Sequence, residues 1–204
     1  MAKIKEIILF CFGDSTDVST WSNVPYLLGK TLEENGVTVR RVNISSTSKW
    51  LPRISKGLQL FARRKREYYR TPLFIWETYP KIREAVREYP DADFCIFLTF
   101  DFYNKFSGIP SLLFSDWTYR IILENRAHLK PGLFDKAPLK AEEDAITHAE
   151  IALPMFSDSY DKMKSAYPSA NLHVINQNVV KYCRRKSRMR ACFHRNIKAI
   201  TSCL

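Results

Sequence analysis

Short runs of apolar residues alternate along this chain with segments in which apolar residues recur at helical spacing. The segments predict helices at about 22–35, 76–89, 116–128, 139–149 and 158–166. The runs predict strands at Ile4–Phe12, Val37–Ile44, Phe94–Phe100, Ile109–Phe114, Ile151–Phe156 and, more briefly, Leu172–Ile175. Strands and helices that alternate in this way pair in parallel through right-handed crossovers. The pattern therefore predicts the α/β class, with a single Rossmann-like, doubly wound, mostly parallel sheet.

The first strand–helix–strand unit sets the expected centre of this sheet. Ile7–Phe12 is expected to be central, with Val37–Ile44 parallel beside it. Ser22 is expected to cap the N-terminus of the helix between these strands, because serine accepts hydrogen bonds from the free amides there. Gly36 is expected to end the same helix.

Residues 45–75 interrupt the alternation. Apolar residues recur there at helical spacing, and they precede the basic run at 63–66; these residues are Trp50, Ile54, Leu58 and Phe61. Such a helix usually packs its apolar stripe on the sheet and leaves its charges in water. A basic amphipathic helix can instead lie on an anionic membrane surface. The pattern favours the first interpretation and keeps a peripheral membrane contact through residues 50–70 as the second.

The formal net charge of +11 is concentrated at the C-terminal end of the chain. Residues 181–204 hold eight lysines and arginines and no acidic residue, which leaves +3 for residues 1–180. We expect residues 1–180 to form the folded domain and the tail at 181–204 to be disordered or aberrant, because the tail offers few large apolar side chains to bury. The charge therefore says little about the ligand of the domain, and nucleic acid is not expected as a partner.

The cysteines and the apolar runs indicate a protein of the cytoplasm. Cys11 and Cys95 lie inside apolar runs, which predicts buried thiols rather than a disulfide framework. Cys183 and Cys192 are separated by eight residues, too far for the short ligand pairs of structural zinc sites, so no metal is expected. No apolar run reaches the roughly 18 residues that a bilayer span needs, and the N-terminus lacks a secretory signal. The expected location is the cytoplasm, and peripheral contact with the inner membrane surface is a second expectation.

The loop after the first strand resembles the opening block of the SGNH (GDSL-type) esterases, in which a serine is the nucleophile. It reads Phe12-Gly13-Asp14-Ser15-Thr16-Asp17. That chemistry needs a histidine base to take the serine proton and donors that hold the oxyanion. The family's Gly-x-Asn-Asp and Asp-x-x-His blocks are missing here. A hydrolase that uses Ser15 is therefore an alternative function, as is a non-catalytic basic binding module.

From the same loop onward the chain resembles a second family more extensively. Its opening reads Gly13-Asp14, then Ser19-Thr20-Trp21-Ser22-Asn23-Val24-Pro25 and Leu32-Glu33-Glu34-Asn35-Gly36-Val37. Its second half reads Phe156-Ser157-Asp158-Ser159-Tyr160, then Tyr167-Pro168 and His173-Val174-Ile175-Asn176-Gln177-Asn178-Val179. In order and spacing, these segments resemble the N-terminal, acceptor-side domain of GT-B retaining glycosyltransferases (glycosyltransferase family 4-like). The resemblance covers about residues 4–180.

The resemblance implies one half of a GT-B fold, in a hexosyltransferase that moves a sugar from a nucleotide-sugar donor to an acceptor such as a glycan or lipid. The donor is a substrate, and no cofactor is implied. In the family, the donor binds to a second Rossmann-like domain, before which this chain would be truncated. We therefore expect the chain to be inactive by itself and to need a separate C-terminal half. Asn23 and Gln177-Asn178 depart from the family's glycine-containing motifs.

Candidate site residues follow the strands, because ligands of open parallel sheets bind at the carboxyl ends of strands. Asp116 is the candidate catalytic residue, since a carboxylate directly after a strand could polarise an acceptor hydroxyl. The alternative is that Ser115 or Asp116 caps the next helix. By the resemblance, acceptor or donor would be bound by Gly13, Asp14, Ser22, Asn23, Asp101, Trp117 and Ser157.

Overall fold

The computed structural model describes residues 4–61, 68–126 and 130–174. At its centre is a five-stranded sheet in the order β2-β1-β3-β4-β5, in which every neighbouring pair is parallel. The strands are β1 (Glu6–Cys11), β2 (Thr38–Asn43), β3 (Phe94–Phe97), β4 (Ser111–Ser115) and β5 (Ile151–Pro154). The predicted α/β, Rossmann-like class is confirmed, and so is the parallel pairing of the first two strands. β1 lies one position from the middle strand, between β2 and β3.

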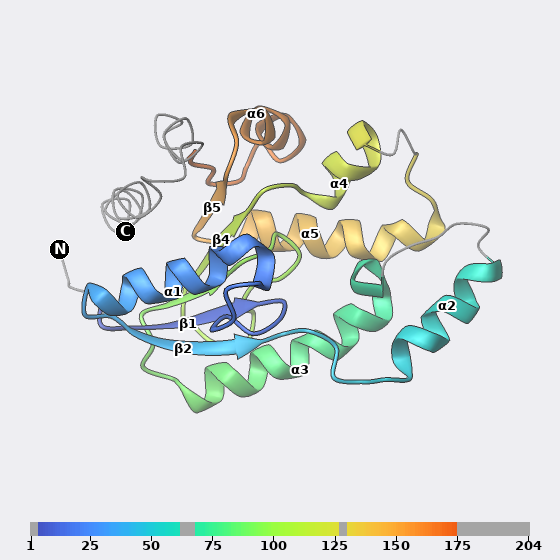
Figure 1. Cartoon of the computed structure of the whole chain (residues 1–204). Helices are drawn as coiled ribbons and strands as arrows, with labels where there is room; N and C mark the ends of the chain where they lie inside the picture. Colours follow the sequence, from blue (N-terminus) through green and yellow to red (C-terminus); the bar gives the residue numbers. More distant parts are fainter. Residues whose placement is uncertain (1–3, 62–67, 127–129, 175–204) are drawn as a thin grey trace.

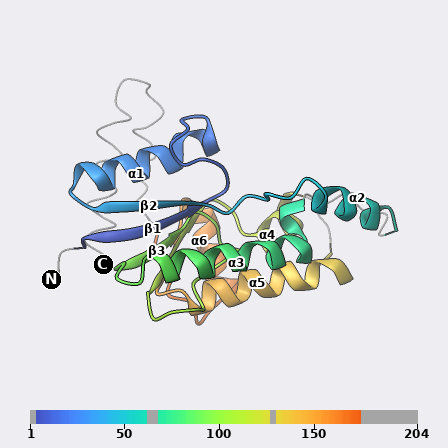
Figure 2. The ribbon, with the colours of Figure 1, turned by 90° about the horizontal axis from the view of Figure 1, so that it is seen from below.

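Helices cover both faces of the sheet (Figures 1 and 2). They are α1 (Val24–Glu34), α2 (Leu51–Phe61), α3 (Pro72–Glu88), α4 (Tyr119–Ile121), α5 (Lys136–His148) and α6 (Ser157–Ala166). A π-helical turn, η3 (Ile122–Arg126), extends α4, and short 3-10 turns form η1 (Thr20–Asn23), η2 (Tyr68–Arg70) and η4 (Leu133–Asp135). Because β1 is buried on both sides, its alternate residues feed two separate cores.

Each core is built by different helices. Leu28 and Leu32 of α1 pack with one face of β1. The other face packs against α3 and α5, through residues such as Ile82 and Ile146. Figure 2 shows α3 and α5 on the side of the sheet opposite α1. This arrangement is the doubly wound sheet that the apolar strands predicted.

Three expected elements differ from the structure. The third strand ends at Phe97, after which the chain bends, although Phe100 stays buried. The sixth strand is reduced, within the described residues, to one bridge between Leu172 and Ala152. The helix expected at 116–128 begins at Tyr119, and its N-cap is Thr118, whose hydroxyl accepts from the amide of Ile121 at 3.2 Å. Neither Ser115 nor Asp116 caps that helix.

The prediction that Ser22 caps the first helix is wrong. The chain enters α1 through three consecutive left-handed residues, Trp21, Ser22 and Asn23, with φ of 39°, 54° and 71°. Asn23 occupies the N-cap position and makes no side-chain capping bond. Residues other than glycine rarely adopt this conformation because the Cβ atom approaches the backbone. The turn therefore holds conformational strain next to the start of α1.

The helix predicted in residues 45–75 is present as α2, but the described part of its apolar stripe, Trp50 and Ile54, does not pack on the sheet as expected. Trp50 and Ile54 are 68% and 53% exposed. Both views show α2 extending away from the sheet (Figures 1 and 2). The side chains of Leu58 and Phe61, the basic run at 63–66 and the whole tail at 181–204 lie outside the described residues. Among the described helices, none is long and apolar enough to span a bilayer.

A buried carboxylate joins the second half of the fold. Glu142 of α5 is fully buried and accepts hydrogen bonds from the amides of Tyr119 and Arg120, the latter at 3.2 Å. The Tyr167 hydroxyl donates to the same carboxylate at 2.7 Å. Burial is the largest influence on this group and raises the pKa of Glu142 from 4.5 to about 7. Glu142 thus holds the first turn of α4 against α5.

Replacing Ser22 with glycine should stabilise the protein. Glycine adopts positive φ without steric cost, and the exposed Ser22 makes no capping bond that would be lost. We expect Ser22→Gly to raise the free energy of unfolding by about 1 kcal/mol in urea denaturation. Gly36→Ala is the matched control in the opposite direction. The φ angle of Gly36 is 81°, which alanine adopts only with strain, and nothing lies within 4 Å of the added Cβ, so the free energy of unfolding should fall through backbone strain alone. A loss of stability in Ser22→Gly would contradict the strain argument.

Glu142 should make stability depend on pH in a defined direction. Between pH 4.5 and about 7 the folded state retains a proton that the unfolded chain has released, so stability falls as the pH rises through this window. We expect wild type to lose on the order of 1–2 kcal/mol between pH 5 and pH 8 relative to Glu142→Gln. Urea titrations at both pH values measure the difference. Parallel pH profiles for the two proteins would contradict it.

Candidate functional site

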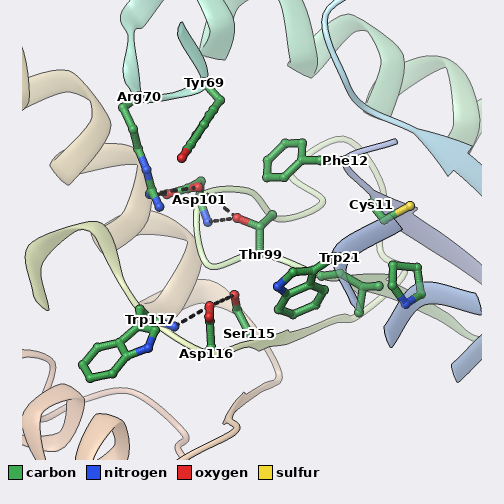
Figure 3. Close-up of a pocket in the computed structure, with 12 residues that line it drawn as sticks. Cys11, Phe12, Trp21, Tyr69, Arg70, Thr99, Asp101, Ser115, Asp116 and Trp117 are labelled. Atoms are coloured by element: carbon green, nitrogen blue, oxygen red, sulfur yellow. Dashed lines mark hydrogen bonds and ion pairs between the residues drawn. The ribbon is translucent and has the colours of Figure 1, made fainter. Parts of the chain in front are cut away.

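A cavity of about 200 Å³ opens at the carboxyl ends of β1, β3 and β4 (Figure 3). This is the edge at which open parallel sheets bind ligands. Its lining combines polar and aromatic groups from five segments: Cys11, Phe12, Trp21, Pro25, Tyr69, Arg70, Leu98, Thr99, Asp101, Ser115, Asp116 and Trp117. Three of the residues predicted for the site, Asp101, Asp116 and Trp117, are therefore brought together here.

Asp116 is held by its neighbours through one carboxylate oxygen. Its Oδ1 accepts from the Trp117 amide at 2.8 Å and from the Ser115 hydroxyl at 3.4 Å. Its backbone carbonyl accepts from the Ser159 hydroxyl of α6 at 2.7 Å. Among the described residues no group bonds to Oδ2 of Asp116, which is half-buried at the cavity wall. That oxygen is available to a hydroxyl group of a ligand.

Across the cavity, Arg70 and Asp101 form a partly buried ion pair. Nη1 of Arg70 donates to Oδ1 and Oδ2 of Asp101 at 3.0 and 3.3 Å. The Thr99 hydroxyl donates to the same carboxylate at 2.9 Å. The guanidinium also lies over the rings of Tyr69 and Tyr119, at 5.1 and 4.9 Å from their centroids. Within the described chain Arg70 has no other hydrogen-bond partner, so Nε and Nη2 remain as donors.

Short-range contacts fix the turn that presents Arg70. The Thr71 hydroxyl donates to the carbonyl of Tyr68 at 2.7 Å and accepts from the amide of Phe74, so that Thr71 caps the N-terminus of α3. The Tyr68 hydroxyl in turn donates to Glu77 at 2.8 Å. Burial raises the pKa of Tyr68 well above its usual range, so this hydroxyl stays a donor. These bonds fix the 3-10 turn η2, which presents Arg70 to the cavity.

Aromatic rings form much of the remaining wall. Figure 3 shows the indole of Trp21 at the cavity, beside Thr99 and Ser115, and the ring of Phe12 above it. The left-handed backbone of Trp21 therefore belongs to a residue of the site. Trp117 instead directs its ring away from Trp21, toward Phe156 at 6.5 Å and Lys162 of α6 at 5.6 Å. Of the two indoles, Trp21 is the better placed to stack on a ligand.

The other predicted binding residues do not line the cavity. The amide of Gly13, where φ is 92°, donates to Asn43 and Ser45 at 3.1 and 2.7 Å, so it is already bonded. Asp14 is exposed and accepts from the amide and hydroxyl of Thr16, which lower the pKa of its carboxyl. The remaining predicted residues also lie outside the lining: Ser22, Asn23 and Ser157.

The environment of Ser15 does not resemble that of an activated nucleophile. The residue is 3% exposed, and its hydroxyl receives a hydrogen bond from Arg41 at 3.3 Å. Of the described histidines, His148 bonds to the Asp144 carbonyl and His173 to Asn171. Neither supplies a base to Ser15, which removes the chemical support for a hydrolase among the described residues.

Cys11 and the acidic groups give no sign of thiol or metal chemistry. Burial is the largest influence on Cys11 and raises the pKa of its thiol to about 11, so it stays protonated. Within the described part of the chain, no group of three or more histidine, cysteine or acidic residues could hold a metal ion. The cavity therefore offers hydrogen bonding and aromatic contact.

Sequence reasoning missed several residues of the cavity. Thr99 and Tyr69 carry no motif, and Arg70 follows a basic run in which no single arginine stands out. Trp21 was part of a family-like segment, yet its place in the wall follows from the left-handed turn, which propensities do not predict. The one usable signal was position, since Thr99 lies two residues after the end of β3.

Comparison with known proteins agrees with this architecture. No family model matches the chain, and no curated protein matches it. Among solved structures, sucrose-phosphate synthase from Thermosynechococcus elongatus superposes with a TM-score of 0.55 at 12% sequence identity. The match covers 86% of this chain and 49% of the synthase, so the chain spans about half the length of that protein. At this identity the likeness is one of fold alone: the chain shares a Rossmann-like, parallel α/β architecture with part of the synthase.

Proposed function

We propose that this chain binds the sugar acceptor of a glycosyltransferase, in a reaction that transfers a sugar from a nucleotide-sugar donor. The observation that carries the proposal is the cavity at the carboxyl ends of β1, β3 and β4, where two carboxylates and an arginine face aromatic rings. The fold likeness to sucrose-phosphate synthase supports the same class of reaction. The proposal includes a role in enzymatic sugar transfer and an acceptor such as a glycan or lipid.

The polar groups of the cavity match the chemistry of a sugar ring. Sugar hydroxyls donate well to carboxylate oxygens such as Oδ2 of Asp116 and accept from guanidinium donors such as Nε of Arg70. The apolar face of a sugar ring packs on an indole, which Trp21 supplies. The arrangement thus presents acceptors, donors and an aromatic face within one small space.

The size of the cavity favours an acceptor over a donor. At about 200 Å³ it is smaller than the pockets of roughly 300–1,000 Å³ that hold drug-sized ligands. One sugar ring fits this space better than a complete nucleotide sugar. The Gly13 amide, which the resemblance implied as a contact of acceptor or donor, is already bonded to Asn43 and Ser45. We therefore place the acceptor here and propose that a separate C-terminal half binds the donor.

Asp116 would orient and polarise the acceptor hydroxyl. The Trp117 amide and the Ser115 hydroxyl fix its Oδ1, so that Oδ2 can accept a hydrogen bond from the attacking hydroxyl of the sugar acceptor. A carboxylate in this position lowers the cost of the developing charge as the hydroxyl attacks. The Ser159 bond to the Asp116 carbonyl keeps the loop in place from α6.

Acceptor binding tests the proposal directly. We expect the chain to bind a member of a panel of mono- and disaccharides, sugar phosphates and short lipid-linked sugars in saturation-transfer NMR. Asp116→Asn should weaken that binding by about tenfold or more, because a charge-assisted hydrogen bond is lost. Asp14→Asn is the matched control, since Asp14 lies in the loop after β1 but outside the cavity lining. Equal affinities for both variants would contradict the proposed site.

Transfer itself should require more than this cavity. Incubated with nucleotide sugars and the identified acceptor, the chain alone should show no donor turnover. Adding a separately expressed donor-binding half should restore transfer, and Asp116→Ala should lower it by about 10²–10⁴-fold. Turnover by the chain alone that Asp116→Ala abolishes would instead place the donor in this cavity.

A further inference from the structure

Helix α2 exposes a face that is both apolar and basic. Trp50 and Ile54 lie one helical turn apart and are 68% and 53% exposed. The basic residues Lys49, Arg53 and Lys56 are exposed beside them. The Arg53 guanidinium lies over the Trp50 ring at 5.1 Å from its centroid. Two large apolar side chains on one turn of a soluble helix leave an apolar surface in water, which marks an interaction site when it is contiguous.

The orientation of this face is fixed by the opposite side of the helix. Ser55 is 3% exposed, and Leu51, on the same side, is half-buried. At the start of the helix the Ser48 hydroxyl accepts from the amides of Trp50 and Leu51, at 3.2 and 3.1 Å. α2 therefore turns Trp50 and Ile54 outward as part of a defined fold.

The loop before α2 is tied to the body of the protein. Glu77 of α3 accepts from the amides of Thr47 and Ser48, at 2.9 and 3.2 Å, and from the Ser46 hydroxyl at 3.0 Å. These bonds lower the pKa of the Glu77 carboxyl against the opposing effect of burial. The carboxylate thus anchors the segment that carries the exposed face.

Charge identifies the partner of this face. No aspartate or glutamate occurs from residue 35 to residue 66, so the basic residues of α2 have no acidic neighbour in sequence. Indole rings prefer the boundary between lipid headgroups and acyl chains, and Lys and Arg beside them bind anionic headgroups. We propose that the face formed by Lys49, Trp50, Arg53, Ile54 and Lys56 docks on an anionic lipid surface.

Docking through α2 would bring the cavity close to the membrane. The turn η2, which supplies Tyr69 and Arg70 to the cavity, contacts α2. Figures 1 and 2 place α2 and the start of α5 at the same end of the molecule. The turn that presents Arg70 thus connects the lipid-facing helix to the site. The lipid contact itself does not rest on the proposed sugar transfer.

Vesicle binding tests the proposal with the full chain. We expect co-sedimentation with vesicles of phosphatidylcholine and phosphatidylglycerol, and much weaker binding to phosphatidylcholine alone. Trp50→Ser with Ile54→Ser, or Lys49→Gln with Arg53→Gln and Lys56→Gln, should each reduce binding by at least about tenfold. The matched control removes three exposed charges from α1 and α3, as Lys30→Gln, Arg83→Gln and Arg87→Gln, and should leave most binding intact.

A second readout separates insertion at α2 from attraction by basic residues elsewhere. Lipids brominated on the acyl chains quench an indole that enters the interface. Quenching should fall in Trp50→Phe and persist in Trp76→Phe, whose indole on α3 is similarly exposed at 71%. Quenching that survives Trp50→Phe, or equal loss of binding in the control triple variant, would overturn the proposal. So would binding of single-stranded RNA that depends on the same three basic residues while vesicles do not bind.

Discussion

The burial of β1 on both faces is the constraint from which the rest of this structure follows. Ile7 and Leu9 enter one core and Ile8 and Phe10 the other, all nearly inaccessible to water. A strand buried in this way needs a layer of helices on each side, and right-handed crossovers then make its neighbours parallel. Parallel strands end at one edge, so the loops after β1, β3 and β4 converge there. The cavity is the consequence of that convergence.

Much of the fold could be predicted from the apolar runs, because a strand that is buried on both faces requires consecutive apolar residues. The strands β1, β2, β4 and β5 fall where these runs lie, and the parallel pairing follows from their spacing. The ends of elements were less predictable. Thr118 rather than Ser115 or Asp116 caps α4, because the chain must first turn away from the sheet edge. Of the three left-handed residues before α1, only Asn23 is of a type that favours this conformation; Trp21 and Ser22 give no such signal.

The candidate site, too, could be predicted only in part. Asp116 and Asp101 could be predicted, since position after a strand is sufficient to bring a side chain to the edge. Their different surroundings could not, because these depend on distant segments: Asp101 is paired with Arg70, 31 residues away, whereas Asp116 is held by its immediate neighbours. This asymmetry gives the two carboxylates different capacities. One is committed to orienting a guanidinium, and the other keeps an oxygen for a ligand.

The segment between β2 and α3 shows where pattern alone fails. A stripe of Trp50, Ile54 and following apolar residues with flanking cations fits a helix packed on a sheet as well as a helix on a lipid surface. The sheet excludes the first arrangement for the described part of the helix, because α3 already covers the face that α2 would need, with Phe74 and Ile82 buried in that core. α2 is therefore displaced outward, and Ser55 rather than Ile54 meets the protein. The core has no room for the apolar face of α2, which explains why Trp50 and Ile54 stay exposed.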